Sequence, residues 1–170
     1  SAFRPRTSHQ QSKARRSSPG FPSATCAARF QRDSRSLGSG EERRALDCWW
    51  EVLGLKADHP EALGHLEDLV TTLGDPEQRL RLDRHLLGLL LEQGTSGDDP
   101  EVCEVRRRIA ATTLAMGRTD EATEAALALL DRPVPEPEDL EIARSVYGAS
   151  DGPPEVFTAL VAASQRIGAS

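Results

Sequence analysis

The residues that could do chemistry are few and scattered in this chain of 170 residues. Its four histidines are His9, His59, His65 and His85. His59 and His65 stand six positions apart across an expected helix start, which is not the spacing of a metal-binding pair. We therefore expect surface or helix-capping roles for the histidines, and no metal site.

The cysteines and glycines also lack the patterns of known chemical sites. Cys26, Cys48 and Cys103 have no C-x-x-C spacing, which argues against a zinc or disulfide framework. No histidine is placed to activate Cys48 or Cys103, so we expect them to pack as small hydrophobic residues. The glycines at 38–40 and 94–97 lack the lysine of a phosphate-binding loop. The sequence predicts a non-catalytic protein without a cofactor.

The elements that carry these residues are predicted by six Pro-Glu dipeptides, which punctuate the chain after residue 40. Proline suits the first helical position because its missing N–H would have no intrahelical partner there, and glutamate favours the positive end of the helix dipole. The same dipole explains the acidic cluster at 136–139. Apolar residues at helical spacing follow, and no strand pattern competes. We expect seven short helices, with caps at Ser39, Asp58, Asp75, Asp99 and either Thr119 or Asp120 among them.

Charge is divided unequally along the chain. Residues 1–40 hold eight Lys and Arg with a single Asp, whereas residues 41–170 hold thirteen Lys and Arg with twenty-six Asp and Glu. The first segment is rich in Ser and Arg and has too few large apolar residues to offset the entropy of ordering. We expect residues 1–40 to be a disordered basic tail and residues 41–170 to be a helical domain.

A repeat is visible in the helical part. Gly40 and Gly74 are 34 residues apart, as are Cys103 and Pro137. Further marks of the repeat are Ala45-x-x-x-Trp49, His59-Pro60-Glu61-Ala62-Leu63 and Leu114-x-x-Gly117-Arg118-x-Asp120-Glu121-Ala122. With its period of 34 and two helices per unit, the chain resembles the tetratricopeptide repeat family over 41–170. The resemblance implies an all-α fold, a short right-handed α-solenoid of antiparallel helix pairs.

The same resemblance implies a binding groove lined by the first helix of each pair. In this chain the groove positions are mainly acidic, and they favour a protein or peptide partner with a basic segment. An ordinary solvated helix surface is the alternative for each of them. The predicted groove residues are Glu61, Asp68, Thr71, Glu104, Arg107, Ala111, Glu138, Glu141 and Ser145.

Two adjacent tryptophans need separate roles, since neighbours on a helix point about 100° apart. We expect Trp49 to pack in the core between helices and Trp50 to be partly exposed. Trp50 is either an apolar flank or a contact for a partner. An apolar edge at this N-terminal repeat would also allow self-association.

These observations favour a non-catalytic protein–protein interaction module, a scaffold or adaptor segment of a larger, bacterial-type protein. Two alternatives stay open. The basic tail could bind nucleic acid through its charge, or the helical repeats could regulate an enzyme whose catalytic domain lies outside these residues. No stretch approaches the roughly 20 apolar residues of a membrane span, and we expect a cytoplasmic location without membrane contact.

Overall fold

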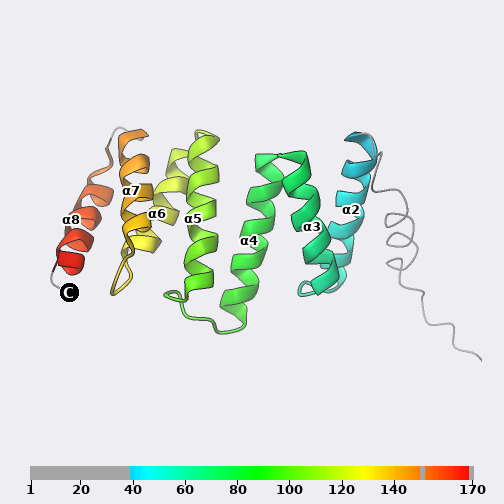
Figure 1. Ribbon diagram of the computed structural model, residues 1–170, viewed down its shortest axis with the longest axis horizontal. Coiled ribbons are helices and arrows are strands. Elements are labelled where there is room, and N and C mark those ends of the chain that lie inside the picture. The colour runs from blue at the N-terminus through cyan, green and yellow to red at the C-terminus, as the bar shows by residue number, and fades with distance from the viewer. Residues whose placement is uncertain (1–38, 150–151, 169–170) are drawn as a thin grey trace, which may run out of the picture. The chain divides into compact units, whose positions relative to one another are not determined.

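The computed structural model describes residues 39–149 and 152–168, which belong to one compact unit, Ser36–Ser170. This described part contains seven α-helices and no strand (Figure 1). The expected all-helical architecture is thus confirmed for it, whereas nearly all of the tail predicted at 1–40 lies outside the described residues. The helices are α2 (Ser39–Leu55), α3 (Pro60–Leu73), α4 (Pro76–Glu92), α5 (Pro100–Ala115), α6 (Thr119–Leu130), α7 (Pro137–Ala149) and α8 (Pro154–Gly168).

Five of these helices begin at a proline, as the Pro-Glu dipeptides predict. Asp75 caps α4, where its carboxylate accepts hydrogen bonds from two backbone N–H groups in the first turn at 3.0 and 3.4 Å. Asp99 caps α5 in the same way, accepting from the N–H of Glu101 at 2.9 Å. Gly74 ends α3 with a backbone φ of 62°, a left-handed conformation that glycine adopts at little cost.

Two of the predicted caps are wrong. The N-cap of α3 is His59 instead of Asp58, and its ring Nδ1 accepts a hydrogen bond from the N–H of Ala62 at 3.4 Å. The N-cap of α6 is Arg118, one residue before the predicted threonine, and its side chain makes no capping bond. Arg118 instead extends to Glu77 in the first turn of α4. The side chain of Arg118 therefore forms an ion pair with another helix, although it stands at the N-cap position of α6.

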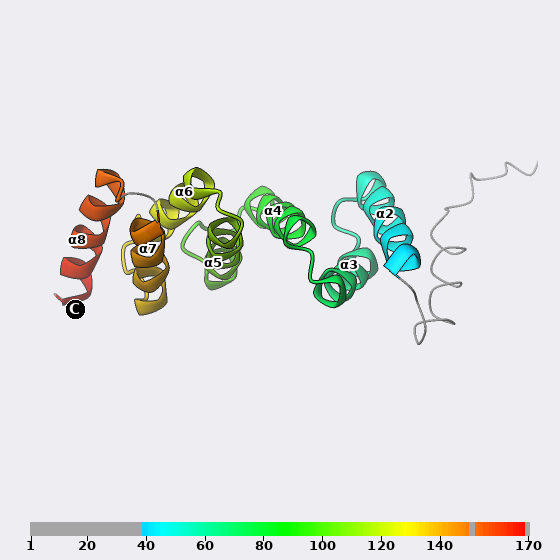
Figure 2. The ribbon, with the colours of Figure 1, turned by 90° about the horizontal axis from the view of Figure 1, so that it is seen from above.

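Each helix packs against its neighbours in the sequence. Contacts join every consecutive pair from α2 to α8, and further contacts join α5 to α7 and α6 to α8. Seen from above, α3, α5 and α7 lie toward one side of the row and α2, α4 and α6 toward the other (Figure 2). Each helix therefore finds its apolar partners close by in the chain.

One hydrophobic cluster lies in the C-terminal half, between α6, α7 and α8. It is built from buried residues of all three helices: Ala122, Ala126, Leu130, Leu140, Ala143, Val146, Val156, Leu160 and Ala163. A second cluster joins α4 and α5 through Leu80, Val105 and Ile109. Trp49 of α2 is 3% exposed and stacks on the half-buried ring of His65 at 4.5 Å, which confirms its predicted place in the core.

Candidate functional site

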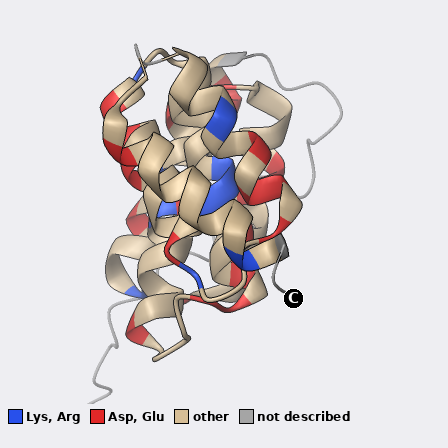
Figure 3. Ribbon diagram, turned by 90° about the vertical axis from the view of Figure 1, so that its left-hand side faces the viewer, with Lys and Arg blue, Asp and Glu red and all other residues tan. Residues whose placement is uncertain are grey.

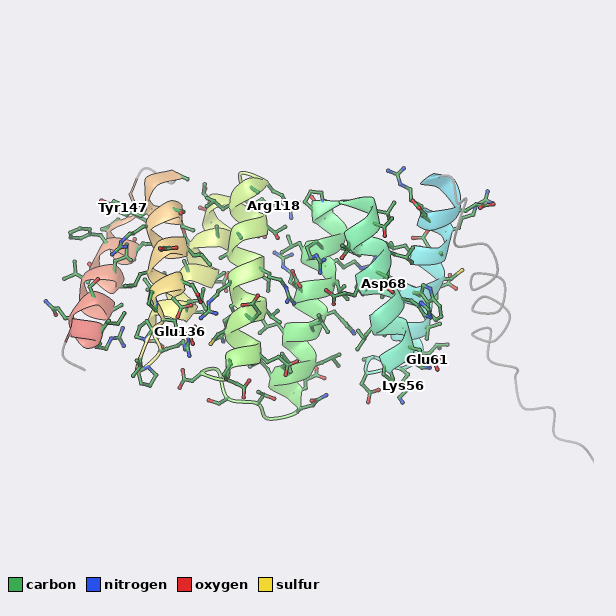
Figure 4. All side chains as sticks on the ribbon, in the orientation of Figure 1. Lys56, Glu61, Asp68, Arg118, Glu136 and Tyr147 are labelled. Carbon is green, nitrogen blue, oxygen red and sulfur yellow. The ribbon has the colours of Figure 1, made fainter. Side chains whose placement is uncertain are left out.

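The predicted groove residues lie on the alternate helices α3, α5 and α7. On α3, Glu61 stands in the first turn and Asp68 about two turns further on, and both are exposed (Figure 4). Thr71 is exposed on the same helix, but its hydroxyl accepts a hydrogen bond from Arg79 of α4 at 2.8 Å. Two carboxylates of α3 are therefore open to solvent.

On α5 and α7 the predicted acidic residues surround one arginine. Glu104, Glu138 and Glu141 are exposed, as are Ala111 and Ser145. Glu104 and Glu138 each lie 3.5 Å from the Arg107 guanidinium, whereas within the described residues the carboxylate of Glu141 has no ion pair. The structure thus brings Glu104, Arg107 and Glu138 together and leaves Glu141 apart from them.

Arg107 is mostly buried, and its strongest partners are two residues that the groove prediction omits. Its Nε donates to Asp139 at 2.7 Å, and one terminal nitrogen donates to Glu136 at 2.5 Å. Burial lowers the pKa of Arg107, but the hydrogen bonds and charges of these carboxylates outweigh it and hold the pKa above its ordinary value. The arginine stays charged and is committed to joining α5 to α7.

Asp139 is the centre of this ion-pair network. Its side chain is completely buried and accepts from Arg107, from Arg132 at 3.0 Å and from the backbone N–H of Glu136 at 2.8 Å. Arg132 also donates to the carbonyl of Asp98 at 3.3 Å, before α5. A buried carboxylate is stable only when it is paired and hydrogen-bonded. This arrangement therefore fixes the loop before α5 and the loop between α6 and α7.

The network continues into the last helix. Arg166 of α8 donates to the carbonyl of Arg132 at 2.7 Å and to that of Leu130 at 2.6 Å. These carbonyls lie at the C-terminal end of α6 and just beyond it, where the helix leaves acceptors unsatisfied. A guanidinium therefore serves as a tertiary C-cap and ties α8 to α6.

A second buried carboxylate joins α4 to α5. Asp83 is fully buried and receives the Arg108 guanidinium at 2.9 Å, while its other oxygen has no hydrogen-bond partner within the described residues. Burial raises the pKa of Asp83 above its ordinary value, although the hydrogen bond and charge of Arg108 oppose that rise. The pair of Asp83 and Arg108 was not predicted from the sequence, because Asp83 lies within a leucine-rich helix whose pattern predicts only apolar packing.

Trp50, the predicted exposed apolar contact, is half-buried under residues of α4. The guanidinium of Arg81 lies 4.0 Å from its ring, and the ring of His85 meets it edge-on at 5.9 Å. Its indole N–H donates to Gln78 at 3.3 Å, and His85 in turn contacts the carbonyl of Ala57 at 2.8 Å. These contacts give Trp50 and His85 a structural role in joining α2 to α4.

Cys103 is fully buried, as expected for a packed small residue, and burial raises the pKa of its thiol. The described residues include no group of three His, Cys, Asp or Glu side chains arranged to hold a metal ion. None of the helices in the described part is long and apolar enough to cross a membrane. Comparisons with protein-family models, with curated proteins and with solved structures find no match to this chain.

Proposed function

We propose that this chain is a non-catalytic interaction module, in which TPR-like helix pairs form a short right-handed solenoid that binds a basic peptide segment. The observation that carries the proposal is the exposure of Glu61, Asp68 and Glu141 on helices of the same side. Exposed carboxylates spread over α3 and α7 attract a cationic segment and set its orientation more than its affinity.

The ion pairs of Arg107 refine which residues meet the ligand. Glu104 and Glu138 already face this guanidinium, so their negative charge is partly neutralised within the protein. Asp68 and Glu141 form no ion pair among the described residues, and they lie outside the buried network. We therefore assign the electrostatic contact chiefly to Asp68 and Glu141, with Glu61 at the end of α3.

The test is a titration of the whole chain with a fluorescent, arginine-rich peptide of about ten residues, followed by anisotropy at two salt concentrations. The double variant Asp68→Asn/Glu141→Gln should weaken binding about threefold to tenfold, as expected for two exposed charges. The matched control is Glu92→Gln/Glu124→Gln, which removes the same charge from exposed positions on α4 and α6. Equal weakening by both pairs would show that only net charge matters, and the proposed surface would then be rejected.

A second candidate function rests on the composition of residues 1–40, which hold eight Lys and Arg against one Asp. Such a segment neutralises phosphates, and its binding to nucleic acid falls steeply with salt. Titration of the chain with a labelled single-stranded oligonucleotide measures that slope. Replacement of Arg15 and Arg16 by glutamine should lower the slope by about 1.4 if both contact phosphates, since each contact to a single strand contributes about 0.7. An unchanged slope would count against this function.

A further inference from the structure

The first two described helices are joined to the others at one place. Further along the chain, α5 comes close to α7 and α6 to α8. By contrast, no Cα of α2 lies within 8 Å of one in α4, and no Cα of α3 lies within 8 Å of one in α5. The backbones of α2 and α3 therefore meet those of the other described helices only between α3 and α4, which Gly74 and Asp75 connect. We call this junction the seam.

An arginine stands in the seam where the equivalent positions hold a small or apolar residue. Arg79 and Ala122 are each the fourth residue of their helix and each follow a left-handed glycine by five positions. The 34-residue repeat matches Ala45 with Arg79 and Ala122 with Val156. The three equivalents are 9%, 0% and 0% exposed, whereas the side chain of Arg79 is 24% exposed. Because small residues let two helices approach closely, the arginine keeps α3 further from α4 than α5 is from α6.

The same arginine also ties the two helices together. Its guanidinium donates to Glu67 at 2.9 Å and to the hydroxyl of Thr71 at 2.8 Å, one turn apart on α3. Both acceptors are exposed. One exposed ion pair and one exposed hydrogen bond are weak enough to break and form again without unfolding either helix.

Arg79 has a second carboxylate available on its own helix. Basic and acidic positions are interspersed over the described helices (Figure 3). Asp83 stands one turn after Arg79 on α4, a spacing at which ion pairs form along a helix. One oxygen of Asp83 is bound by Arg108, while the other is buried and has no hydrogen-bond partner within the described residues. A guanidinium that leaves α3 therefore has an acceptor to bind, which gives Arg79 two discrete positions.

The helix that carries this arginine is held firmly to the helices that follow it. A hydrophobic cluster and the buried pair of Asp83 and Arg108 join α4 to α5, and an ion pair between Arg84 and Glu121 joins α4 to α6. From the other side of the seam, Trp50 of α2 meets the ends of long polar side chains of α4. The seam thus separates a small body, α2 and α3, from a large body, α4 to α8.

We propose that the seam is a hinge about which the small body moves against the large body, with Arg79 as its latch. In the closed position the guanidinium binds Glu67 and Thr71 of α3, and in the open position it binds the second oxygen of Asp83. The backbone change is taken up between the two helices, since a hinge needs only a few residues at the ends of elements.

Distances between pairs of spin labels on the whole chain, measured by double electron–electron resonance, test this hinge. Labels on Glu51→Cys of α2 and Thr158→Cys of α8 span the seam, whereas labels on Glu92→Cys of α4 and Thr158→Cys both lie in the large body. All three positions are exposed. Cys103 is fully buried and stays unlabelled, and the two other cysteines are replaced by serine.

The variant Glu67→Gln/Thr71→Val removes both acceptors on α3 and leaves Arg79 in place. Loss of these two weak bonds should raise the ratio of open to closed distances across the seam about fivefold. The matched control is Glu121→Gln, which removes one exposed carboxylate from the ion pair between α4 and α6 and should leave that ratio unchanged. One unchanged distance in the wild type and the variant, or equal broadening of the pair inside the large body, would overturn the hinge.

Asp83→Asn tests the second position of the latch. It weakens the acceptor of the open position, so the ratio of open to closed distances should fall. The label pair inside the large body verifies that α4 still packs as before. If the ratio rose while that pair stayed unchanged, Asp83 would not be the acceptor that Arg79 binds in the open position.

The hinge also bears on the proposed ligand, a consequence that rests on the proposed function. Asp68 and Glu141 lie on opposite sides of the seam, so opening changes their spacing. Saturating arginine-rich peptide should therefore favour one of the two distances. If the peptide does not bind, the proposed function fails, while the distances without peptide still decide the hinge. If it binds and leaves the ratio unchanged, the ligand does not span the seam.

Discussion

Replacement of Asp139 by asparagine should destabilise the protein by about 3 kcal/mol. The carboxylate is fully buried and holds Arg107 at 2.7 Å and Arg132 at 3.0 Å. Removal of one partner from a buried ion pair costs about 3–5 kcal/mol, because the remaining charge is left uncompensated. We take the lower value, since Glu136 remains near both arginines and the asparagine carbonyl can still accept one hydrogen bond.

Urea unfolding followed by circular dichroism measures this effect, with the loss read from the transition midpoint. The matched control is Glu138→Gln, which removes a carboxylate beside the same Arg107. Glu138 is 69% exposed and 3.5 Å away, and such a surface pair contributes at most about 1 kcal/mol. If Asp139→Asn lost no more stability than Glu138→Gln, the buried network could not be what joins α5 to α7.

Three further predictions concern other parts of the described unit. Burial raises the pKa of Asp83, so the stability that its protonated form contributes is present at low pH and is lost as pH rises through that raised pKa. The unfolding free energy of the wild type minus that of Asp83→Asn should therefore fall as pH rises above about 4, the ordinary pKa of aspartate, and a difference that rises would contradict the assignment. Within α3, Gly64→Ala should stabilise the protein by about 0.5–1 kcal/mol, because an added Cβ meets open space. At the end of α3, Gly74→Ala should destabilise it by about 1 kcal/mol, because φ is 62° there. Urea midpoints of the two variants that move in the same direction would refute this. Trp50→Ala should lower the free energy of unfolding by about 2 kcal/mol, because the contacts of Trp50 join α2 to α4. It should also speed amide hydrogen exchange in α2 more than in α8, and equal effects on both helices would argue against that role.

Much of the fold could be predicted from local signals. Proline at a helix start, aspartate as a cap and glycine at a helix end act within one turn of backbone, so the starts of α4 and α5 and the end of α3 follow from the sequence. The errors at α3 and α6 have different causes: an unusual capping residue within the local turn at α3, and a contact with a distant helix at α6. His59 caps α3 through a ring nitrogen, and Arg118 extends to another helix.

The candidate site was predictable only in part, for a related reason. Exposure of the acidic groove residues follows from helical periodicity, whereas the partners of Arg107 are 29 and 32 positions away in the sequence. The signal that could have revealed Asp139 is its position three residues after Glu136, where a carboxylate can accept the N–H of the residue before the helix. We interpreted that cluster only as a complement to the helix dipole.

Arg107 links the stability of this protein to the charge that it presents. Its contact with Asp139 is buried and holds α5 to α7, while its contacts with Glu104 and Glu138 are at the surface. Asp139 has no exposed surface and the two surface carboxylates are already paired, so the proposed basic ligand is left with Asp68 and Glu141, which have no ion pair among the described residues. Binding at those two residues would leave the ion pairs of Arg107 intact. Loss of affinity with little loss of stability is therefore expected when Asp68 and Glu141 are replaced, and the reverse order of effects is expected at Asp139.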